Sequence, residues 1–359
     1  MMLEQLLAAI QPPSAEARSL AKRRWDSIAK PLGSLGLLED AVIEIAGIRG
    51  NTQVRLDQRC VVVFCADNGI VEEGVTQTGQ EVTAVVSENL VSGKTSVCAI
   101  ARSMRCDVLP VDIGVARDLT DGLLVHKIAY GTDNIARGPA MTRAQALDAL
   151  LFGASLAEKL KRDGYDILAT GEMGIGNTTT SSAVASVLTG RTPAEVTGRG
   201  AGLSAEGLMR KIDAIKRAIA VNRPDANDPV DVIAKVGGFD LAGMTGLFLG
   251  AAACKIPVLI DGFISAVAAL AAARLCPDAA GYALATHLSD EPAARMVLET
   301  LGKRPMITAG MRLGEGTGAV AALGLLDAAV AVYTDMSTFD DIAIDAYQPF
   351  DETAGTLPC

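Results

Sequence analysis

The sequence predicts an α/β fold built on a parallel sheet, and two observations lead to this prediction. Half of the 359 residues are hydrophobic, only 4% are aromatic and 36 are glycine. An interior of Ala, Val, Leu and Ile is typical of α/β enzymes, whose central strands are apolar on both faces. Short β-branched runs also alternate with helical stretches along the chain. Strands that alternate with helices form a parallel sheet through right-handed crossovers.

The expected elements follow the chain in order. Helical spacing over residues 14–48 is broken at Pro31-Leu32-Gly33. The expected strands are 61–64, 108–113, 123–128, 167–169 and 257–260, with 282–286 and 306–308 as weaker candidates. The expected helices are 82–102, 143–162, 241–253 and 319–333, and residues 340–359, which lose periodicity, are expected to form a loosely held tail.

The composition argues against two classes of partner. The formal net charge of −10 disfavours nucleic acid and anionic membranes, because both prefer basic surfaces. An anionic small substrate is still compatible with this charge, since local amides and one Lys can oppose the global field. The N-terminus carries no export signal, and the most apolar region, 241–275, is interrupted by Lys255, Pro257 and Asp261. We therefore expect a cytoplasmic protein without a membrane span.

The cysteines and histidines give no sign of a metal site. The seven cysteines include no CxxC pair and their number is odd, so we expect reduced thiols rather than a zinc knuckle or a disulfide framework. Only His126 and His287 are present, which excludes a multi-histidine centre. No metal and no cofactor is expected.

Polar and glycine-rich residues follow three of the expected strands. They are Asp67-Asn68-Gly69, the segment 171–174 and Asp261-Gly262. In open parallel sheets, ligands bind beyond the carboxyl ends of the strands. We therefore expect a ligand site at this edge of the sheet.

The segment 166–179 reads as a strand, a glycine loop and a helix capped at Asn177 or Thr178. Closely spaced glycines let backbone N–H groups approach a phosphate, and the helix N-terminus adds a partial positive charge. An ordinary tight turn is the alternative. A second glycine loop at 198–202, followed by Lys211, favours phosphate binding.

Two apparent nucleotide motifs are incomplete. Residues 92–95 resemble the end of a Walker A loop, but Glu88 stands where its first Gly is required, so the carboxyl end of a helix is the better interpretation. The loop at Gly171 begins G-x-x-G, and no acidic residue follows at a second strand. An NAD-dependent dehydrogenase is therefore a weak alternative.

The segment 312–318 places Glu315 between two glycines, just before an apolar helix. A carboxylate on such open backbone can be approached closely by a ligand, and in a pocket it could act as a general base. A solvated loop residue or a helix-start charge explains the pattern equally well.

Six segments together resemble the nicotinate-nucleotide:dimethylbenzimidazole phosphoribosyltransferases of cobalamin biosynthesis, in the right order and over nearly the whole chain. They are 30–36, 65–69 with 73–75, 171–179, 235–240 with 243–246, 261–263 and 311–318. The resemblance implies transfer of the phosphoribosyl group of nicotinate mononucleotide to 5,6-dimethylbenzimidazole, an aromatic base, which gives α-ribazole 5'-phosphate and nicotinate. The strand ending in paired acids that marks enzymes using phosphoribosyl pyrophosphate is absent, which fits a nucleotide donor.

The resemblance also implies an architecture. It predicts a Rossmann-like parallel sheet flanked by helices, a small helical domain formed by both ends of the chain, and a homodimer. The boundaries would be 1–55 for the N-terminal helical part, 56–318 for the large α/β domain, and 319–359 for the helix and tail that complete the small domain.

Roles for individual residues follow from the same resemblance. Glu315 matches the general base, and Glu172 matches a second acidic residue near the reaction centre. The phosphate and ribose of the nucleotide would be bound by Gly174, Gly176, Asn177, Thr178, Gly200, Gly202, Lys211, Ser289 and Gly314. The base would be bound by Thr78, Val86, Met173 and Leu313.

The chain departs from the family pattern around the base pocket. Asn68 stands where members often have His, residues 76–79 lack an aromatic and a proline, and Val85-Val86 replace a Gln. The same chemistry on a phenol, a purine or another benzimidazole is therefore an alternative. A non-catalytic nucleotide-binding subunit is a second alternative, but retention of Glu315 and Glu172 counts against it.

Overall fold

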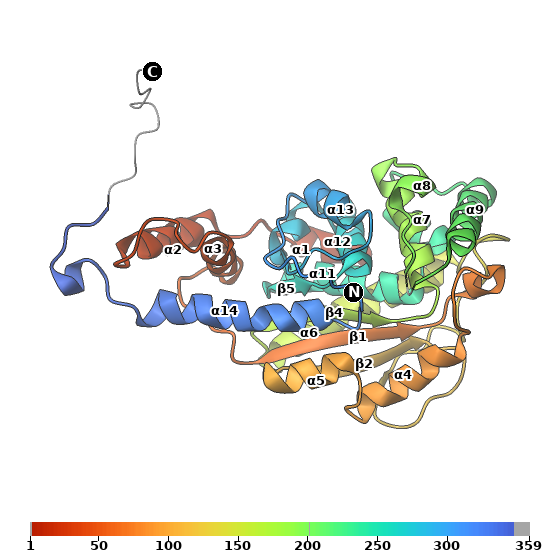
Figure 1. Ribbon diagram of the computed structural model, residues 1–359, viewed down its shortest axis with the longest axis horizontal. Coiled ribbons are helices and arrows are strands. Elements are labelled where there is room, and N and C mark those ends of the chain that lie inside the picture. The colour runs from red at the N-terminus through yellow and green to blue at the C-terminus, as the bar shows by residue number, and fades with distance from the viewer. Residues whose placement is uncertain (1, 201, 348–359) are drawn as a thin grey trace, which may run out of the picture.

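The computed structural model, which describes residues 2–200 and 202–347, contains a six-stranded sheet in the order β3-β2-β1-β4-β5-β6 (Figure 1). All neighbouring strands are parallel. The strands are β1 (Arg59–Ala66), β2 (Asp107–Gly114), β3 (Leu124–Val125), β4 (Ile167–Met173), β5 (Val258–Ile260) and β6 (Ala283–Ala285). This order is that of a doubly wound dinucleotide-binding fold, so the predicted Rossmann-like sheet is confirmed.

Helices precede, connect and follow the strands. They are α1 (Leu3–Ala9), α2 (Ala15–Ser27), α3 (Leu37–Arg49), α4 (Glu81–Val91), α5 (Ser96–Ser103), α6 (Arg143–Arg162), α7 (Asn177–Thr189), α8 (Pro193–Val196), α9 (Ala205–Asn222), α10 (Pro229–Val236), α11 (Phe239–Cys254), α12 (Phe263–Leu275), α13 (Ala294–Thr300) and α14 (Thr317–Asp335). Three short 3₁₀ turns complete them: η1 (Gly69–Glu73), η2 (Pro277–Tyr282) and η3 (Asp340–Ile342).

Three expected elements differ in the structure. The strand expected over 123–128 is only the two-residue strand β3. The helix expected over 82–102 is two helices, α4 and α5, because Gly93 takes a φ of +71° and Thr95 begins the second helix as its N-cap. The strand expected at 306–308 is reduced to a single bridge between Ile307 and His287. The amides of Met306 and Ile307 both donate to the Thr286 carbonyl, so the ladder does not continue. Of the expected tail, residues 348–359 lie outside the described part.

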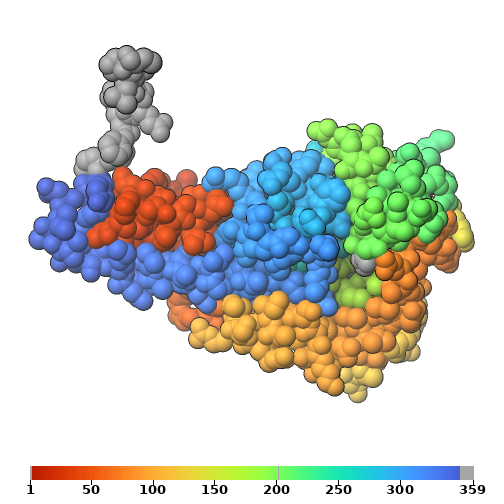
Figure 2. Space-filling model, in the orientation of Figure 1, coloured from red at the N-terminus to blue at the C-terminus, as the bar shows by residue number. Residues whose placement is uncertain are grey.

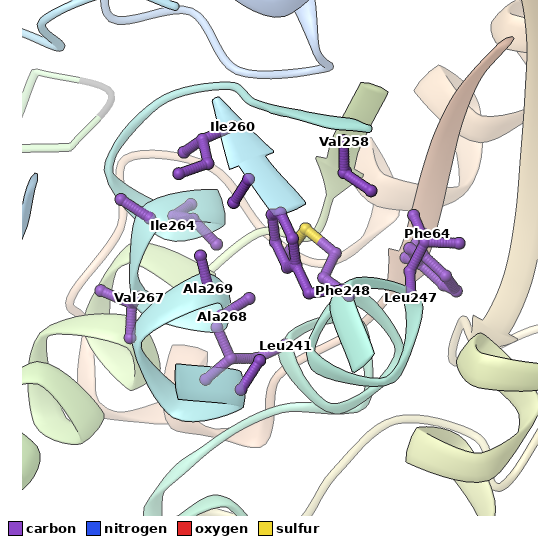
Figure 3. Close-up of a cluster of buried hydrophobic side chains, with 14 of the residues drawn as sticks. Phe64, Leu241, Leu247, Phe248, Val258, Ile260, Ile264, Val267, Ala268 and Ala269 are labelled. Atoms are coloured by element: carbon purple, nitrogen blue, oxygen red, sulfur yellow. The ribbon is translucent and has the colours of Figure 1, made fainter. Parts of the chain in front are cut away.

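The two faces of β1 pack against different helices. A side chain on Gly243 of α11 would lie 2.7 Å from the ring of Phe64, so Phe64 faces α11. A side chain on Gly316 would lie 2.6 Å from Val61, so Val61 faces the start of α14. Figure 3 shows Phe64 beside Leu247 in the hydrophobic layer between β1 and α11, which continues into α12. Both faces are buried, which explains the continuous apolar run of this strand.

Helices α6 and α11 approach closely because glycines line their contact. A Cβ atom on Gly246 would overlap the carbonyl oxygen of Leu150, and one on Gly153 would overlap the carbonyl oxygen of Gly243. A Cβ on Gly250 would likewise overlap the backbone of Ala154. Backbone-to-backbone packing of this kind leaves no room for adjustment, so it fixes α11 and, through it, the strands on which the site is built.

Segments from near the two ends of the chain pack together at one end of the elongated molecule (Figure 2), where α2 and α3 lie beside the end of α14. The rings of Trp25 and Tyr333 are 5.1 Å apart, and residue 28 forms a bridge with residue 338. Helix α14 also contacts β4 and α5, so it runs from the sheet to this end. The division into domains at 55 and 318 stays a prediction.

Helix α14 has the length and composition of a membrane span, the only such helix in the part of the chain that the structure describes. Half of its most apolar stretch is buried within the protein, against β4, α3 and α5. All six described cysteines are unpaired, and Cys359 lies outside the described residues.

We predict that Gly246→Ala lowers the free energy of unfolding by about 3 kcal/mol, because the added methyl forces α6 and α11 apart. Thermal and urea denaturation measure this change. Gly324→Ala is the matched control, because Gly324 is also helical and its Cβ would meet only the flexible end of Met104, at 3.4 Å. The control should be neutral or slightly stabilising. Equal effects of the two substitutions would show that the α6–α11 contact is not tight.

Candidate active site

A cavity of about 220 Å³ opens beyond the carboxyl ends of β4, β5 and β6, and residues 75–78, from the segment that follows β1, form another part of its wall. Strands β1 and β4 are neighbours in the sheet, and the strand order reverses between them. This is the switch point at which doubly wound folds bind their ligands. Thirteen of the fifteen predicted site residues line the cavity: Thr78, Glu172, Met173, Gly174, Gly176, Asn177, Thr178, Gly200, Lys211, Ser289, Leu313, Gly314 and Glu315.

The two other predicted residues, Val86 and Gly202, do not line it. Val86 is on the second turn of α4, whereas the cavity reaches only residues 75–78 of the loop before that helix. The carbonyl of Gly202 accepts a hydrogen bond from the side chain of Gln77, which links two walls of the cavity. Gly202 therefore supports the loop, and its contact with the nucleotide stays a prediction.

Asn68 also lies outside the cavity wall. Its side chain is completely buried and accepts a hydrogen bond from Thr180 Oγ1 at 3.3 Å. It packs behind the glycine loop, where a Cβ on Gly174 would lie 3.2 Å from its amide nitrogen. The change from His to Asn therefore affects the residues that support the loop. Among the positions that differ from the family pattern, only residues 76–78 line the cavity.

The loop that carries Glu315 has an unusual backbone. Gly314, Glu315 and Gly316 all have positive φ, at +92°, +61° and +91°. Two of the three positions suit glycine, but a non-glycine residue in this region carries a conformational cost, and such strain clusters at functional sites. A side chain on Gly171 of β4 would lie 2.5 Å from the carbonyl oxygen of Glu315, so glycine there lets the loop lie directly on the strand.

Asp261, the first residue after β5, binds this loop to the sheet. Its Oδ2 accepts from the amide of Gly316 at 3.1 Å, and its Oδ1 accepts from Gly318 at 2.8 Å and Ala319 at 3.0 Å. These amides belong to the N-terminus of α14, which has no other acceptor for them within the helix. Burial raises the pKa of Asp261, while nearby His287 and the three amides oppose that rise.

The Glu315 carboxylate is held at a second point. Its Oε2 accepts a hydrogen bond from the amide of Val97 at 3.1 Å, in the first turn of α5. The side chain is half-buried and lines the cavity. A carboxylate held in this way has a fixed direction and can accept a proton from a ligand.

Glu172 faces the same loop from β4, because a side chain on Gly314 would lie 2.5 Å from its Oε1. Burial raises the pKa of Glu172 to about 8, and the charge of Asp240 adds to this effect. Burial also raises the pKa of Asp240, to about 6. Near neutral pH, Glu172 is therefore mostly protonated and can donate a hydrogen bond, whereas Asp240 is mostly ionised.

Asn177 connects these two acids. Its Nδ2 donates to Glu172 Oε2 and, at 3.0 Å, to Asp240 Oδ2. One side-chain amide thus satisfies two buried carboxyl groups, and it sits at the first residue of α7. The residue predicted as a possible helix cap instead orients the acid in the cavity.

A neighbouring part of the cavity wall is suited to an anion. The N-terminus of the 13-residue helix α7 lies there, behind Gly176 with its φ of +95°. The ammonium of Lys211 donates to Thr178 Oγ1 at 2.8 Å and is fully buried. Burial lowers the pKa of Lys211 to about 8, so the residue is charged at neutral pH. A buried charge of this kind is stabilised by an anionic partner.

Sequence reasoning missed several residues of the cavity wall, among them Gln77, Arg199, His287, Glu291 and Arg312. It also gave Asp261 no role, although it found the segment. Position was the available signal for Asp261 and His287, because Asp261 directly follows β5 and His287 is the second residue after β6. Gln77 lies in a loop that no pattern connects to the sheet, whereas Arg199 lies within the glycine loop 198–202 that the sequence did indicate, but its side chain was given no role.

No group of three or more His, Cys, Asp or Glu side chains that could hold a metal ion occurs among residues 2–200 and 202–347. The buried acids of the cavity are instead satisfied by amides, as described above.

Comparison with known proteins gives consistent matches. The sequence matches the phosphoribosyltransferase family over residues 10–344. It is 51% identical to the nicotinate-nucleotide–dimethylbenzimidazole phosphoribosyltransferase of Acetivibrio thermocellus, over 97% of this chain and 99% of that protein. Its counterpart from Ruminiclostridium cellulolyticum is 48% identical, over 98% and 100% of the two chains.

A solved structure agrees with the sequence matches. The crystal structure of CobT from Thermus thermophilus superposes with a TM-score of 0.88 at 40% identity, and covers 92% of this chain and 99% of that one. The fold and the sequence matches agree, and this chain belongs to the nicotinate-nucleotide–dimethylbenzimidazole phosphoribosyltransferase family.

Proposed function

We propose that the chain transfers the phosphoribosyl group of nicotinate mononucleotide to 5,6-dimethylbenzimidazole, with α-ribazole 5'-phosphate and nicotinate as products. One observation carries the proposal: a single cavity is lined both by Lys211 and the N-terminus of α7, which suit an anion, and by the carboxyl groups of Glu172 and Glu315. The names of the relatives support the same donor and acceptor.

The reaction assigned to this geometry is a single displacement. One ring nitrogen of the benzimidazole attacks the anomeric carbon of the ribose, and the bond from that carbon to the pyridinium nitrogen breaks with its electron pair going to nicotinate. The proton on the other ring nitrogen passes to Glu315. Attack opposite the leaving group converts a β-nucleotide into an α-riboside, and holding both rings in line supplies much of the acceleration.

The second glutamate acts differently from the first in this account. Glu172 is protonated near neutral pH, so it does not compete with Glu315 for the proton of the base and can donate a hydrogen bond to a ligand in the cavity. Leu313 and Met173 supply the apolar contacts for the acceptor's ring, next to Thr78.

Two other functions use the same site. Transfer to another base, such as a phenol or a purine, is favoured only by the composition of residues 76–78, the one departing segment on the cavity wall. A non-catalytic nucleotide-binding subunit would have no use for the strained backbone of Glu315. The homodimer, the small helical domain and the cytoplasmic location stay predictions.

Glu315→Gln is predicted to lower turnover at least about a hundredfold while the affinity for nicotinate mononucleotide changes little, because the amide keeps the size of the side chain but cannot take the proton. Purified protein is incubated with nicotinate mononucleotide and dimethylbenzimidazole, and the riboside phosphate is identified by mass. Glu299→Gln, an exposed change on α13, is the control. Normal turnover of the Glu315 variant would refute the base assignment, and absence of the product with the native protein would refute the function.

Lys211→Ala is predicted to weaken the binding of nicotinate mononucleotide by about 1.5–3 kcal/mol, because its phosphate contacts the Lys211 ammonium. Binding of the phosphate-free riboside should hardly change. For the native protein, affinity for the mononucleotide should fall as the pH rises through about 8, where Lys211 loses its proton. Calorimetric titration measures both. Lys216→Ala, exposed on the same helix, is the matched control. Equal losses for both ligands would place Lys211 outside the phosphate site.

A further inference from the structure

Glu291 is an acidic residue at the anion-binding end of the cavity. It follows β6 and lines the cavity together with Lys211 and Gly200. A side chain on Gly198 would overlap its Oε2, so the carboxylate rests directly on the backbone of the glycine loop 198–202. A negative side chain in this place is unexpected in a site built for a phosphate, since two anions close together repel each other.

The carboxylate of Glu291 is incompletely satisfied. Its Oε2 is buried and has no hydrogen-bond partner among the described residues. Burial raises the pKa of Glu291, while the Lys211 ammonium and the Gly200 amide lower it. The charge of Asp290 raises it further and that of Arg312 lowers it, and these two residues pair with each other at 3.1 Å.

The groups that stabilise Glu291 are the groups that a phosphate needs. Lys211 and the Gly200 amide are both assigned to the phosphate of the donor nucleotide, and both act on this carboxylate when no ligand is present. Lys211 Nζ lies 3.4 Å from where a side chain on Gly200 would begin, so these two donors share one small space. The Glu291 carboxylate is therefore a negative charge of the protein itself, next to the two groups that are assigned to the phosphate.

We infer that the carboxylate of Glu291 competes with the donor's phosphate for Lys211 and the Gly200 amide, and that it takes up a proton from solvent when the phosphate binds. The inference rests on the proposed function, because it takes the phosphate to lie at this end of the cavity. Once neutral, the carboxyl group no longer repels the phosphate and can donate a hydrogen bond to one of its oxygens. No bond to the nucleotide is formed or broken in this step.

The test compares the native protein with Glu291→Gln, which keeps the size of the side chain and removes its charge. Dissociation constants for nicotinate mononucleotide and for the phosphate-free riboside are measured by calorimetry at about pH 6 and about pH 7.5, because a Glu with a raised pKa is more protonated at the lower value while Lys211 keeps its charge at both. Titration in two buffers of different ionisation enthalpy counts the protons taken up. Glu299→Gln on α13 removes the same charge away from the cavity and is the matched control.

At the higher pH, the Gln variant should bind the mononucleotide about tenfold more tightly than the native protein, and the difference should shrink at the lower pH. The native protein should take up more protons on binding than the variant. The riboside should bind both proteins equally. The phosphate itself titrates near pH 6, but it contributes equally to both proteins, so the comparison removes its effect.

Three results would overturn the inference. They are unchanged affinity for the mononucleotide at both pH values, weaker binding by the Gln variant, and an equal change for both ligands. If the native protein binds the riboside as tightly as the mononucleotide, the phosphate site itself is wrong, and the inference falls with the proposed function. A native preference for the mononucleotide combined with an unchanged Gln variant would refute the role of Glu291 alone. The proton count of the native protein tests the inference without any substitution.

Discussion

The site depends on one buried carboxylate. Asp261 leaves the end of β5 and accepts three backbone amides from the start of α14, which binds that helix to the sheet at the switch point. This attachment holds the backbone of residues 314–316 with three successive positive φ angles, a conformation that the local sequence alone would not maintain. The hydrogen bond from Val97 then fixes the direction of the Glu315 side chain. Catalytic geometry is in this way set by hydrogen bonds between segments that are far apart in the sequence.

Burial gives the acidic residues of the cavity different properties. Glu172 is held by Asn177 beside Asp240, and its pKa is raised to about 8 by burial and by that neighbouring charge. Glu315 instead accepts an amide at the start of a helix, where a negative charge is favoured. Two glutamates that face the same loop can therefore act as a hydrogen-bond donor and a proton acceptor. Lys211 and Glu291 also line the cavity, where each charge shifts the pKa of the other, and we infer that this balance changes when an anion enters.

Much of this could be predicted from the sequence, for physical reasons that differ between elements. The alternation of apolar strands and helices predicted the parallel sheet, and the glycines around Glu315 and after β4 predicted the two loops, because few other residues allow such backbones. Asp240 could not be connected to Glu172, since that contact exists only after α11 packs on the sheet. Val86 was expected at the base pocket but lies beyond the loop that reaches it, and Asn68 packs behind the wall. Patterns report local conformation, whereas contacts between loops depend on the assembled sheet.

The central claim is that Asp261 acts through the position of Glu315. A double-mutant cycle with Asp261→Asn and Glu315→Gln, read as kcat/KM, tests this most directly. The Asn side chain keeps the size of Asp261 but turns an amide group toward a backbone N–H. If the claim holds, Asp261→Asn should lower kcat/KM at least about tenfold in the native protein, and by less than about twofold when Glu315 is already Gln. Losses that simply multiply would show that Asp261 acts independently of Glu315, and would contradict the account.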